Sequence, residues 1–213
     1  MVRANQIAYE YIKSRILDGV LRPAQRLVES QLAEEIKVSR NTVKKVLLQL
    51  EQEHLIVIEN NKGAKVLSLS IEEIQEYYEI RKVLEILVVK AAVEHITDVA
   101  LHLMGDIFAK MCEFRDKQDY DSYSRCNSRF HDIIYEASGK SVAVNMIKGI
   151  KIQLTRFRFR TMLVPGRSDD SIREHKALLD AFIAKDCKAA VIAIETHIDN
   201  VINTIVKYKA LYY

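Results

Sequence analysis

The chain has 213 residues, of which 49% are apolar and 29% charged, an ordinary balance for a water-soluble globular protein. Its 6 glycines and 2 prolines are too few for a loop-rich all-β protein, and no apolar run reaches the roughly 18 residues of a membrane span. We therefore expect a mainly α-helical, cytoplasmic protein without a membrane partner.

The net charge of +3 arises in the first third of the chain. Residues 1–70 hold 11 Lys and Arg against 8 Asp and Glu, whereas residues 71–213 hold 21 of each. Positive charge confined to one segment suits contact with a polyanion such as a nucleic acid. The three cysteines are far apart and lack CxxC spacing, which predicts reduced thiols rather than a disulfide frame or a zinc knot.

The N-terminal part predicts three helices in quick succession. Residues 4–18 carry a helical apolar stripe, and residues 29–36 form a short second helix. In the segment 38–50, VSRNTVKKVLLQL, the apolar residues recur at the spacing of one buried helix face, and Ser39 can cap the helix start. Two short helices so closely spaced are typical of a helix-turn-helix motif.

Two β-rich runs follow the third helix. They are Leu55–Ile58 and Lys65–Leu69, and the turn residues Asn60, Asn61 and Gly63 separate them. A β-hairpin after a helix-turn-helix is the wing of a winged helix. This segment predicts a small hairpin wing.

Near Ser70 the apolar period changes from 2 to 3.6 residues, which divides the chain into domains 1–70 and 71–213. The second domain is predicted to be an all-α bundle of six to seven helices. The expected helices lie near 71–95, 98–118, 120–137, 141–163, 169–184 and 187–209.

The polar first turn of the segment 38–50 predicts a DNA recognition helix, because such helices present their N-terminal residues to base edges in the major groove. Arginine can read guanine, and asparagine can read adenine, through paired hydrogen bonds. The alternative is a capped helix whose lysines form a solvated face. The predicted DNA-contacting residues are Ser39, Arg40, Asn41, Thr42, Lys44 and Lys45 on the helix, with Lys62, Gly63 and Lys65 on the wing.

Residues 8–70 resemble the winged-helix domain of the GntR transcription regulators, in particular their FadR-like class. The motifs that carry the resemblance are Pro23, Arg26–Leu27, QLAEE at 31–35, VSRNTV at 38–43, LEQEHLI at 50–56 and NKGAKV at 61–66. The resemblance adds Arg26 to the predicted DNA contacts. It also implies a homodimer on a near-palindromic operator, in line with the paired half-sites of helix-turn-helix dimers.

The sequence departs from the GntR pattern at several positions. Ala24 and His54 stand where the family has a glycine, and Ser30 or Gln31 replaces an arginine. Lys44–Lys45 replaces an Arg–Glu pair. Because lysine lacks arginine's planar bidentate contact, these changes bear on which operator sequence is read.

Three histidines of the second domain lie on or beside apolar helix stripes. His131 borders one stripe, His175 falls within the next, and His197 flanks the last, while Asn127 precedes His131 by one turn. Imidazoles favour late first-row divalent metals. These four residues therefore predict a metal site, with zinc first and nickel or manganese as alternatives; a hydrogen-bonded polar core is the other interpretation.

Residues 71–209 resemble the FCD effector domain that follows a FadR-like winged helix. Metal-bearing members have Asp or Asn four residues before a Phe–His, then a Glu–His, then a His on the last helix. The matching residues here are Asn127, Phe130–His131, Glu174–His175 and His197. The resemblance implies that a small carboxylate metabolite binds beside the metal.

Two arginines, Arg81 and Arg158, also lie on apolar stripes, and a buried arginine needs an anionic partner. One interpretation is an internal ion pair, with Glu85 or Glu174 as the candidate partner. The other, which the FCD resemblance implies, is that both arginines hold the carboxylate of the effector.

A metal-dependent hydrolase with an appended DNA-binding module is the alternative function. Against it, Glu174 and Asp132, the carboxylates near the histidines, are expected to be exposed, and no nucleophile elbow, P-loop or dinucleotide fingerprint is present. A structural DNA binder without effector would have no use for the inward polar groups. We therefore predict a non-enzymatic transcription regulator, expected to be a repressor, that binds operator DNA under control of a carboxylate effector.

Overall fold

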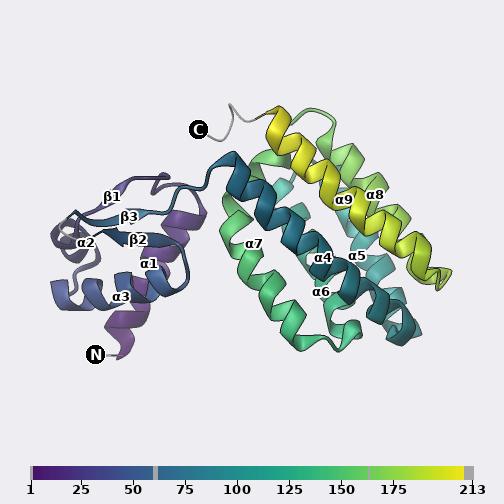
Figure 1. Cartoon of the computed structure of the whole chain (residues 1–213), viewed down its shortest axis with the longest axis horizontal. Helices are drawn as coiled ribbons and strands as arrows, with labels where there is room; N and C mark the ends of the chain where they lie inside the picture. Colours follow the sequence, from purple (N-terminus) through teal and green to yellow (C-terminus); the bar gives the residue numbers. More distant parts are fainter. Residues whose placement is uncertain (1, 60–61, 163, 209–213) are drawn as a thin grey trace. The chain divides into compact units, whose positions relative to one another are not determined.

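The structure, a computed structural model, describes the backbone of residues 2–59, 62–162 and 164–208, and their side chains except those of 2 and 155–160. The chain divides into two compact units, Met1–Ser70 and Ile71–Tyr213. Figure 1 shows a mixed helix and sheet unit and an all-helical unit, as the sequence predicts. The fold is mainly α, with one small sheet in the described residues.

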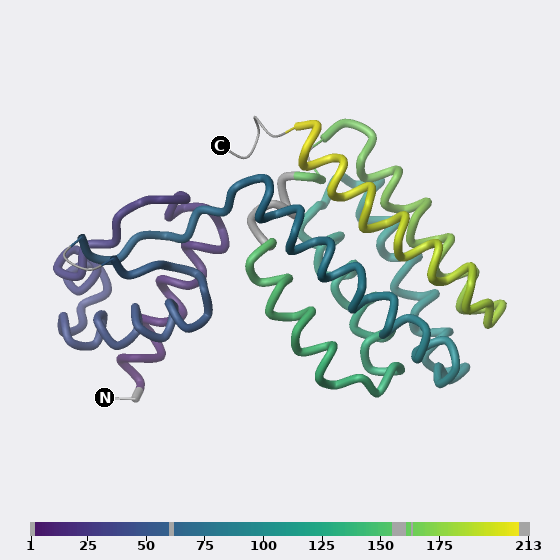
Figure 2. The backbone as a smooth tube through the Cα atoms, in the orientation of Figure 1, coloured from purple at the N-terminus to yellow at the C-terminus, as the bar shows by residue number. Residues whose placement is uncertain are grey.

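The N-terminal unit contains three helices and a three-stranded antiparallel sheet. Its elements are α1 (Val2–Leu17), β1 (Arg26–Leu27), α2 (Glu29–Ile36), α3 (Arg40–Gln52), β2 (Ile56–Glu59) and β3 (Gly63–Val66). The strand order is β1-β3-β2, with both pairs antiparallel. Figure 2 traces the chain through these elements and into the helical unit.

The wing differs from the expected two-stranded hairpin. A short strand, β1, adds to β3 with Arg26 opposite Lys65 and Leu27 opposite Ala64. Two residues carry no readable period, so this strand is invisible to pattern analysis. β3 also begins at Gly63 rather than Lys65, because Gly63 pairs with Glu59 at the end of β2. Asn60 and Asn61, predicted at the turn, lie outside the described residues.

The helix α3 forms as its sequence predicts. The side-chain oxygen of Ser39 accepts a hydrogen bond from the Thr42 backbone N–H at 3.1 Å, which caps the helix. Its apolar residues Val43, Val46, Leu47 and Leu50 are all buried. They pack with α1 and α2 in one core, so the polar residues of α3 are turned outward.

The C-terminal unit is a bundle of helices within the described residues. They are α4 (Ile71–His95), α5 (Asp98–Asp116), α6 (Tyr120–Ser138), α7 (Ser141–Met162), α8 (Arg167–Ile183) and α9 (Cys187–Lys207). α4 packs against α6, α7 and α9, and α8 packs against α5 and α9 (Figure 1). Fully buried Phe130 and Phe182 lie in its core. Cys112, Cys126 and Cys187 are free thiols.

Judged by length and composition alone, one of the described helices, α9, could cross a membrane. Its buried residues Ala190, Ala193, Ile194 and Ile198 pack within the bundle. Burial in the bundle therefore accounts for these apolar residues of the helix.

Ala24 and His54, the two positions where the family has glycine, both adopt the left-handed backbone conformation, with φ of 60° and 55°. His54 follows the end of α3, and Ala24 lies in the turn before β1. This conformation costs a residue with a Cβ about 1–2 kcal/mol. The preference for glycine at these positions therefore has a backbone cause.

We predict that His54→Gly raises the free energy of unfolding by roughly 0.5–1 kcal/mol, because glycine adopts the left-handed conformation without strain. Part of this gain is lost because glycine also makes the unfolded chain more flexible. His54→Ala is the matched control, since it removes the imidazole and keeps the Cβ. Chemical denaturation followed by circular dichroism measures both. An equal gain from the two substitutions would assign the effect to the exposed imidazole instead.

Candidate DNA-binding surface and metal centre

The predicted DNA-contacting residues lie on one unit and are largely exposed. Arg40, Asn41, Lys44 and Lys45 project from α3, while Thr42 and Lys65 are half-buried. The hydroxyls of Ser39 and Thr42 lie 2.8 Å apart, so both already serve the start of α3. The helix thus presents an arginine, an asparagine and two lysines to solvent.

The wing joins this surface through Arg26. Its guanidinium donates a hydrogen bond to the Lys62 carbonyl at 3.0 Å, which ties β1 to the wing turn. Lys65 forms an ion pair with Glu59 at 2.5 Å, so its charge is partly balanced within the wing. Gly63 has φ +83°, and a Cβ there would meet no atom within 4 Å among the described residues. Glycine is needed here for the turn rather than for close packing.

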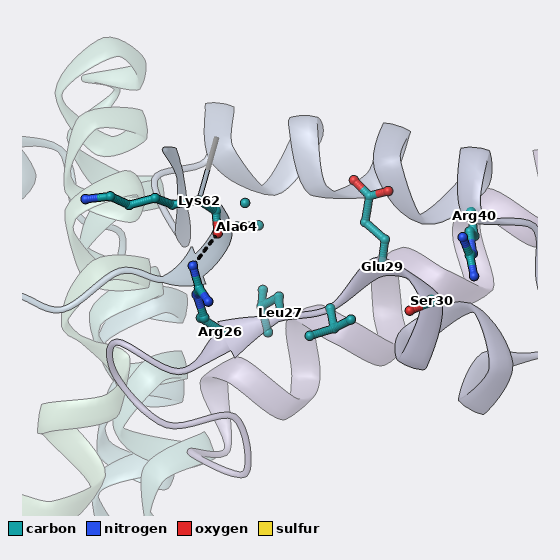
Figure 3. A pocket seen from close by; sticks show the side chains of 9 residues that line it. Arg26, Leu27, Glu29, Ser30, Arg40, Lys62 and Ala64 are labelled. Carbon is teal, nitrogen blue, oxygen red and sulfur yellow. Dashed lines mark hydrogen bonds between the residues drawn. The ribbon is translucent and has the colours of Figure 1, made fainter. Parts of the chain in front are cut away.

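A groove of about 370 Å³ lies between the wing and the starts of α2 and α3. Figure 3 shows Arg26 and Lys62 toward one end, Arg40 toward the other, and Glu29 between them. Cationic groups that flank a groove of this kind suit the phosphates of a nucleic acid. Glu29 is the acidic member of the lining, and it would repel a phosphate placed beside it.

The three predicted histidines converge in the helical unit, although they come from three different helices. His131 lies on α6, His175 on α8 and His197 on α9, and all three are buried. One ring nitrogen from each lies within 4.8 Å of the others. The Nε2 atoms of His131 and His175 are 3.2 Å apart, and Asn127 Oδ1 lies 3.1 Å from His175 Nε2. The side chains of the four predicted residues thus meet at one point.

Hydrogen bonds determine which ring nitrogens of two histidines are free. His175 Nδ1 lies 2.6 Å from the Ser171 carbonyl oxygen, which can only accept, so Nδ1 donates. His197 Nδ1 lies 2.8 Å from a carboxylate oxygen of Glu174 and donates in the same way. In both rings the Nε2 lone pair is left as a ligand, which is the arrangement of metal-binding histidines.

The three imidazoles are held neutral. Burial lowers the pKa of His131 well below its usual range, and the neighbouring His175 and His197 lower it further. Burial, together with His197, lowers the pKa of His175 to about 3. Burial also lowers the pKa of His197, although Glu174 partly opposes this effect. Neutral imidazole is the form that binds a metal.

Glu174 was predicted to be exposed, and this prediction is wrong. Its carboxylate is buried and accepts hydrogen bonds from Arg167 at 2.9 and 3.1 Å, from His197 at 2.8 Å, and from Asn200 at 2.8 Å. Burial alone would raise the pKa of Glu174, but the hydrogen bond from His197 and the charge of Arg167 lower it to about 2. Glu174 is therefore an ionised group that orients the ring of His197.

Arg167 escaped the sequence analysis because the helix was expected to begin at residue 169, whereas α8 begins at Arg167 itself. One signal could have found it: Arg167, Ser171, Glu174 and Leu178 share one helix face with His175. The buried hydroxyl of Tyr123 also donates to Ser171 Oγ at 2.7 Å, which completes the support of α8.

The two predicted effector arginines have different outcomes. Arg81 is buried and pairs with Glu85, with Nε and a terminal nitrogen 3.0 and 2.9 Å from one carboxylate oxygen. Tyr135 donates to the same oxygen at 2.7 Å. The ion-pair interpretation of Arg81, with Glu85 as partner, is therefore confirmed. The side chain of Arg158 lies outside the described residues.

The donor set fits a transition metal. His131 and His175 turn nitrogens toward each other, and Asn127 adds an oxygen, so three groups rich in lone pairs face one another. His131 Nδ1 is buried and has no hydrogen-bond partner among the described residues. A cation would use these lone pairs, whereas without one a proton on His131 Nε2 can be donated to His175 Nε2.

A cavity of about 30 Å³ adjoins the histidines, and Asn127, Arg81, Lys151 and Arg167 are among the residues that line it. This volume holds about one water-sized ligand. The described structure thus has room beside the histidines for a small ligand but not for a whole metabolite.

Comparisons with known proteins agree with this arrangement. The model of the gntR family of bacterial regulatory proteins matches residues 4–66, and the FCD domain model matches residues 76–200. The chain belongs to the GntR family and carries an FCD domain. It is 25% identical over 197 residues to the HTH-type transcriptional regulator YdhC of Bacillus subtilis, covering 90% of this chain and 86% of the relative.

Two further matches extend this result. The HTH-type transcriptional repressor GlaR of Escherichia coli is 26% identical over 201 residues, covering 89% of this chain and 90% of GlaR. The solved structure of E. coli McbR/YncC superposes with a TM-score of 0.77 at 22% identity, covering 98% of this chain and all of that one. The GntR family and these relatives are DNA-binding transcription regulators rather than enzymes, and the hydrolase alternative finds no support.

We predict that Glu85→Gln lowers the free energy of unfolding by roughly 3 kcal/mol or more, because it leaves the buried Arg81 guanidinium without its counter-charge. Glu136→Gln is the control: it breaks the exposed pair with Arg129, whose loss is expected to cost less than about 1 kcal/mol. Urea denaturation monitored by tyrosine fluorescence checks both. Similar losses from the two variants would show that Arg81 finds water or another anion.

Proposed function

We propose that this GntR regulator is a homodimeric repressor whose operator affinity is controlled by a divalent metal and a small carboxylate effector in its FCD domain. The observation that carries the proposal is the meeting of His131, His175 and His197, whose ligand atoms lie within 4.8 Å of one another. The relative GlaR is named a repressor, which supports the sign of regulation. Operation in the cytoplasm follows from a DNA target.

Metal identity follows from the donor chemistry. His131, His175 and His197 offer neutral nitrogens and Asn127 an amide oxygen, while the nearest carboxylate, Glu174, is taken up by four hydrogen bonds. Imidazole suits zinc and nickel, whereas manganese prefers carboxylate and water oxygens. We therefore propose zinc, with nickel as the second choice. When bound, the metal would supply a positive centre for a carboxylate effector.

The effector part of the proposal rests on cations near the metal centre. Arg81 lines the adjoining cavity, but its charge is balanced by Glu85. A carboxylate that entered would compete with Glu85 for the guanidinium, and the cavity would have to widen from about 30 Å³. We propose Arg81 as an effector contact on this basis, and we propose Arg158 on the FCD resemblance alone.

DNA recognition is proposed to use the surface of α3 and the wing. Arg40 and Asn41 would contact bases, because they stand exposed in the first turn of the recognition helix. Lys44, Lys45, Lys62 and Arg26 would contact phosphates, with Gly63 and Lys65 at the wing, and the hydroxyls of Ser39 and Thr42 beside them. By linkage, if the effector lowers the affinity of the protein for the operator, the operator lowers the affinity for the effector by the same factor.

We predict that wild-type protein takes up about one zinc ion per chain, and that His131→Ala combined with His175→Ala abolishes this uptake. Elemental analysis after dialysis against zinc measures the content, and circular dichroism checks the fold. His102→Ala is the matched control, because this exposed histidine lies outside the cluster. Wild-type protein that retains no zinc, nickel or manganese would identify the cluster as a polar core.

We predict that binding to duplex DNA weakens steeply with salt, by about 0.9 log units per log unit of salt for each phosphate neutralised. Lys44→Ala with Lys45→Ala should reduce that slope by roughly 2, since two phosphate contacts are lost. Arg125→Ala with Lys188→Ala, two exposed cations of the helical unit, is the control. Fluorescence anisotropy on one duplex over a salt series measures the slopes. Equal slopes for wild type and the α3 variant would show that these two lysines do not contact DNA phosphates.

A further inference from the structure

α4 carries apolar residues on two faces, although the helical unit covers only one of them. Tyr78 and Val88 are buried in the core, where α4 packs against α6, α7 and α9. On the outer face, Ile80 is 49% exposed, Val83 68% and Leu87 48%. Figure 1 shows this helix between α7 and α9. A helix that is apolar on opposite faces is normally covered on both, so the outer face of α4 indicates a contact surface.

The outer face of α4 has a regular spacing. Five exposed residues, which we call the α4 seam, follow one another in steps of four, three, four and three: Glu76, Ile80, Val83, Leu87 and Lys90. This alternation keeps side chains on one line along a helix, and it is the spacing with which two helices pack as a coiled coil. The seam therefore has an apolar centre and one opposite charge at each end.

The two end charges indicate which partner fits the seam. Neither Glu76 nor Lys90 forms an ion pair with a described residue. Two copies of α4 that pack antiparallel across a two-fold axis at Val83 would place Glu76 of each copy beside Lys90 of the other. Parallel copies would place like charges side by side. A second copy of this chain, in the antiparallel orientation, therefore complements both the charges and the apolar centre.

The position of the seam along α4 also suits a DNA-binding dimer. The N-terminal unit ends at Ser70 and α4 begins at Ile71, twelve residues before Val83. An antiparallel pair centred on Val83 would separate the two starts of α4 by roughly 36 Å along the helix direction. Paired half-sites on a duplex lie about 34–36 Å apart. A parallel pair would bring the two starts to within about 10 Å.

We propose that the α4 seam is the two-fold contact of the homodimer, with α4 of one copy packed antiparallel against α4 of the other. The inference rests on the homodimer of the proposed function and specifies the surface, the direction and the register of its contact. Val83 lies at the axis opposite its own copy, and Ile80 packs against Leu87 on either side. The Glu76–Lys90 pairs close the two ends of the contact.

The first test measures dimer dissociation of the full-length protein by sedimentation equilibrium. Val83→Glu is expected to raise the dissociation constant at least about 100-fold, because two carboxylates would meet at the centre of an apolar contact. Val99→Glu is the matched control, since it makes the same change at a valine of α5 that is 81% exposed and lies outside the seam. Circular dichroism checks that both variants fold.

The second test reverses the charges at the ends of the seam. Glu76→Lys and Lys90→Glu are each expected to raise the dissociation constant about fivefold, since each brings like charges together twice per dimer. The double variant is expected to return to within about twofold of wild type, because the pairs form again with the signs exchanged. A parallel pair of helices gives no such rescue.

The results distinguish this contact from the homodimer as such. The inference is overturned if Val83→Glu dimerises as tightly as Val99→Glu, or if the double charge variant is as weak as the single variants. With a dimeric wild type, either result leaves the homodimer standing and puts its contact elsewhere. A wild-type protein that is monomeric at every concentration contradicts the homodimer itself, and this inference with it.

Discussion

The buried carboxylate of Glu174 is the interaction on which the polar interior of the FCD domain depends. Two nitrogens of Arg167, one of His197 and one of Asn200 donate to it, so a single side chain joins the start of α8 to the middle of α9. A carboxylate withdrawn from water is tolerated only with such a set of donors. By accepting from His197 Nδ1, Glu174 also leaves the opposite ring nitrogen as a ligand.

A second buried ion pair, Arg81 with Glu85, is built on the same principle but joins different helices. Both charges lie on α4, and the Tyr135 hydroxyl from α6 donates to Glu85. Burial and the neighbouring Glu85 carboxylate raise the pKa of Tyr135 well above its usual range, so this hydroxyl stays protonated and remains a donor. Arg81 and Arg167 are therefore each balanced by a buried carboxylate, and an anion that approaches either must displace that carboxylate or use a donor that is still vacant.

Much of this arrangement could be predicted from the sequence because it follows from local periodicity. The helix boundaries of the bundle, the cap at Ser39 and the inward turn of His131, His175 and His197 all depend on a 3.6-residue repeat with strong apolar signals. The family motifs added the grouping of the histidines with Asn127. Their actual convergence required the packing of α6, α8 and α9, which no single segment encodes.

Other features could not be predicted from the sequence, and particular residues show the physical reasons. In the sequence, Glu174 looks like a surface residue because charged residues usually lie on the outward face of a helix. Its burial is possible because Arg167 on α8 and Asn200 on α9 both donate hydrogen bonds to its carboxylate. β1 was missed because two residues carry no period, and it exists through its pairing with β3. The sequence left two candidate partners for Arg81, Glu85 and Glu174. Arg81 pairs with Glu85, which lies one turn further along the same helix.

The neutrality of the three imidazoles has a consequence for the stability of the helical bundle. Rings that carry no charge near pH 7 do not repel one another, and Phe130 packs edge-on against both His131 and His175. The hydrophobic interior of the bundle can accordingly form around the three rings by itself, unlike small zinc modules that fold only with their metal. The fold of the domain therefore does not depend on a ligand to hold these three rings together.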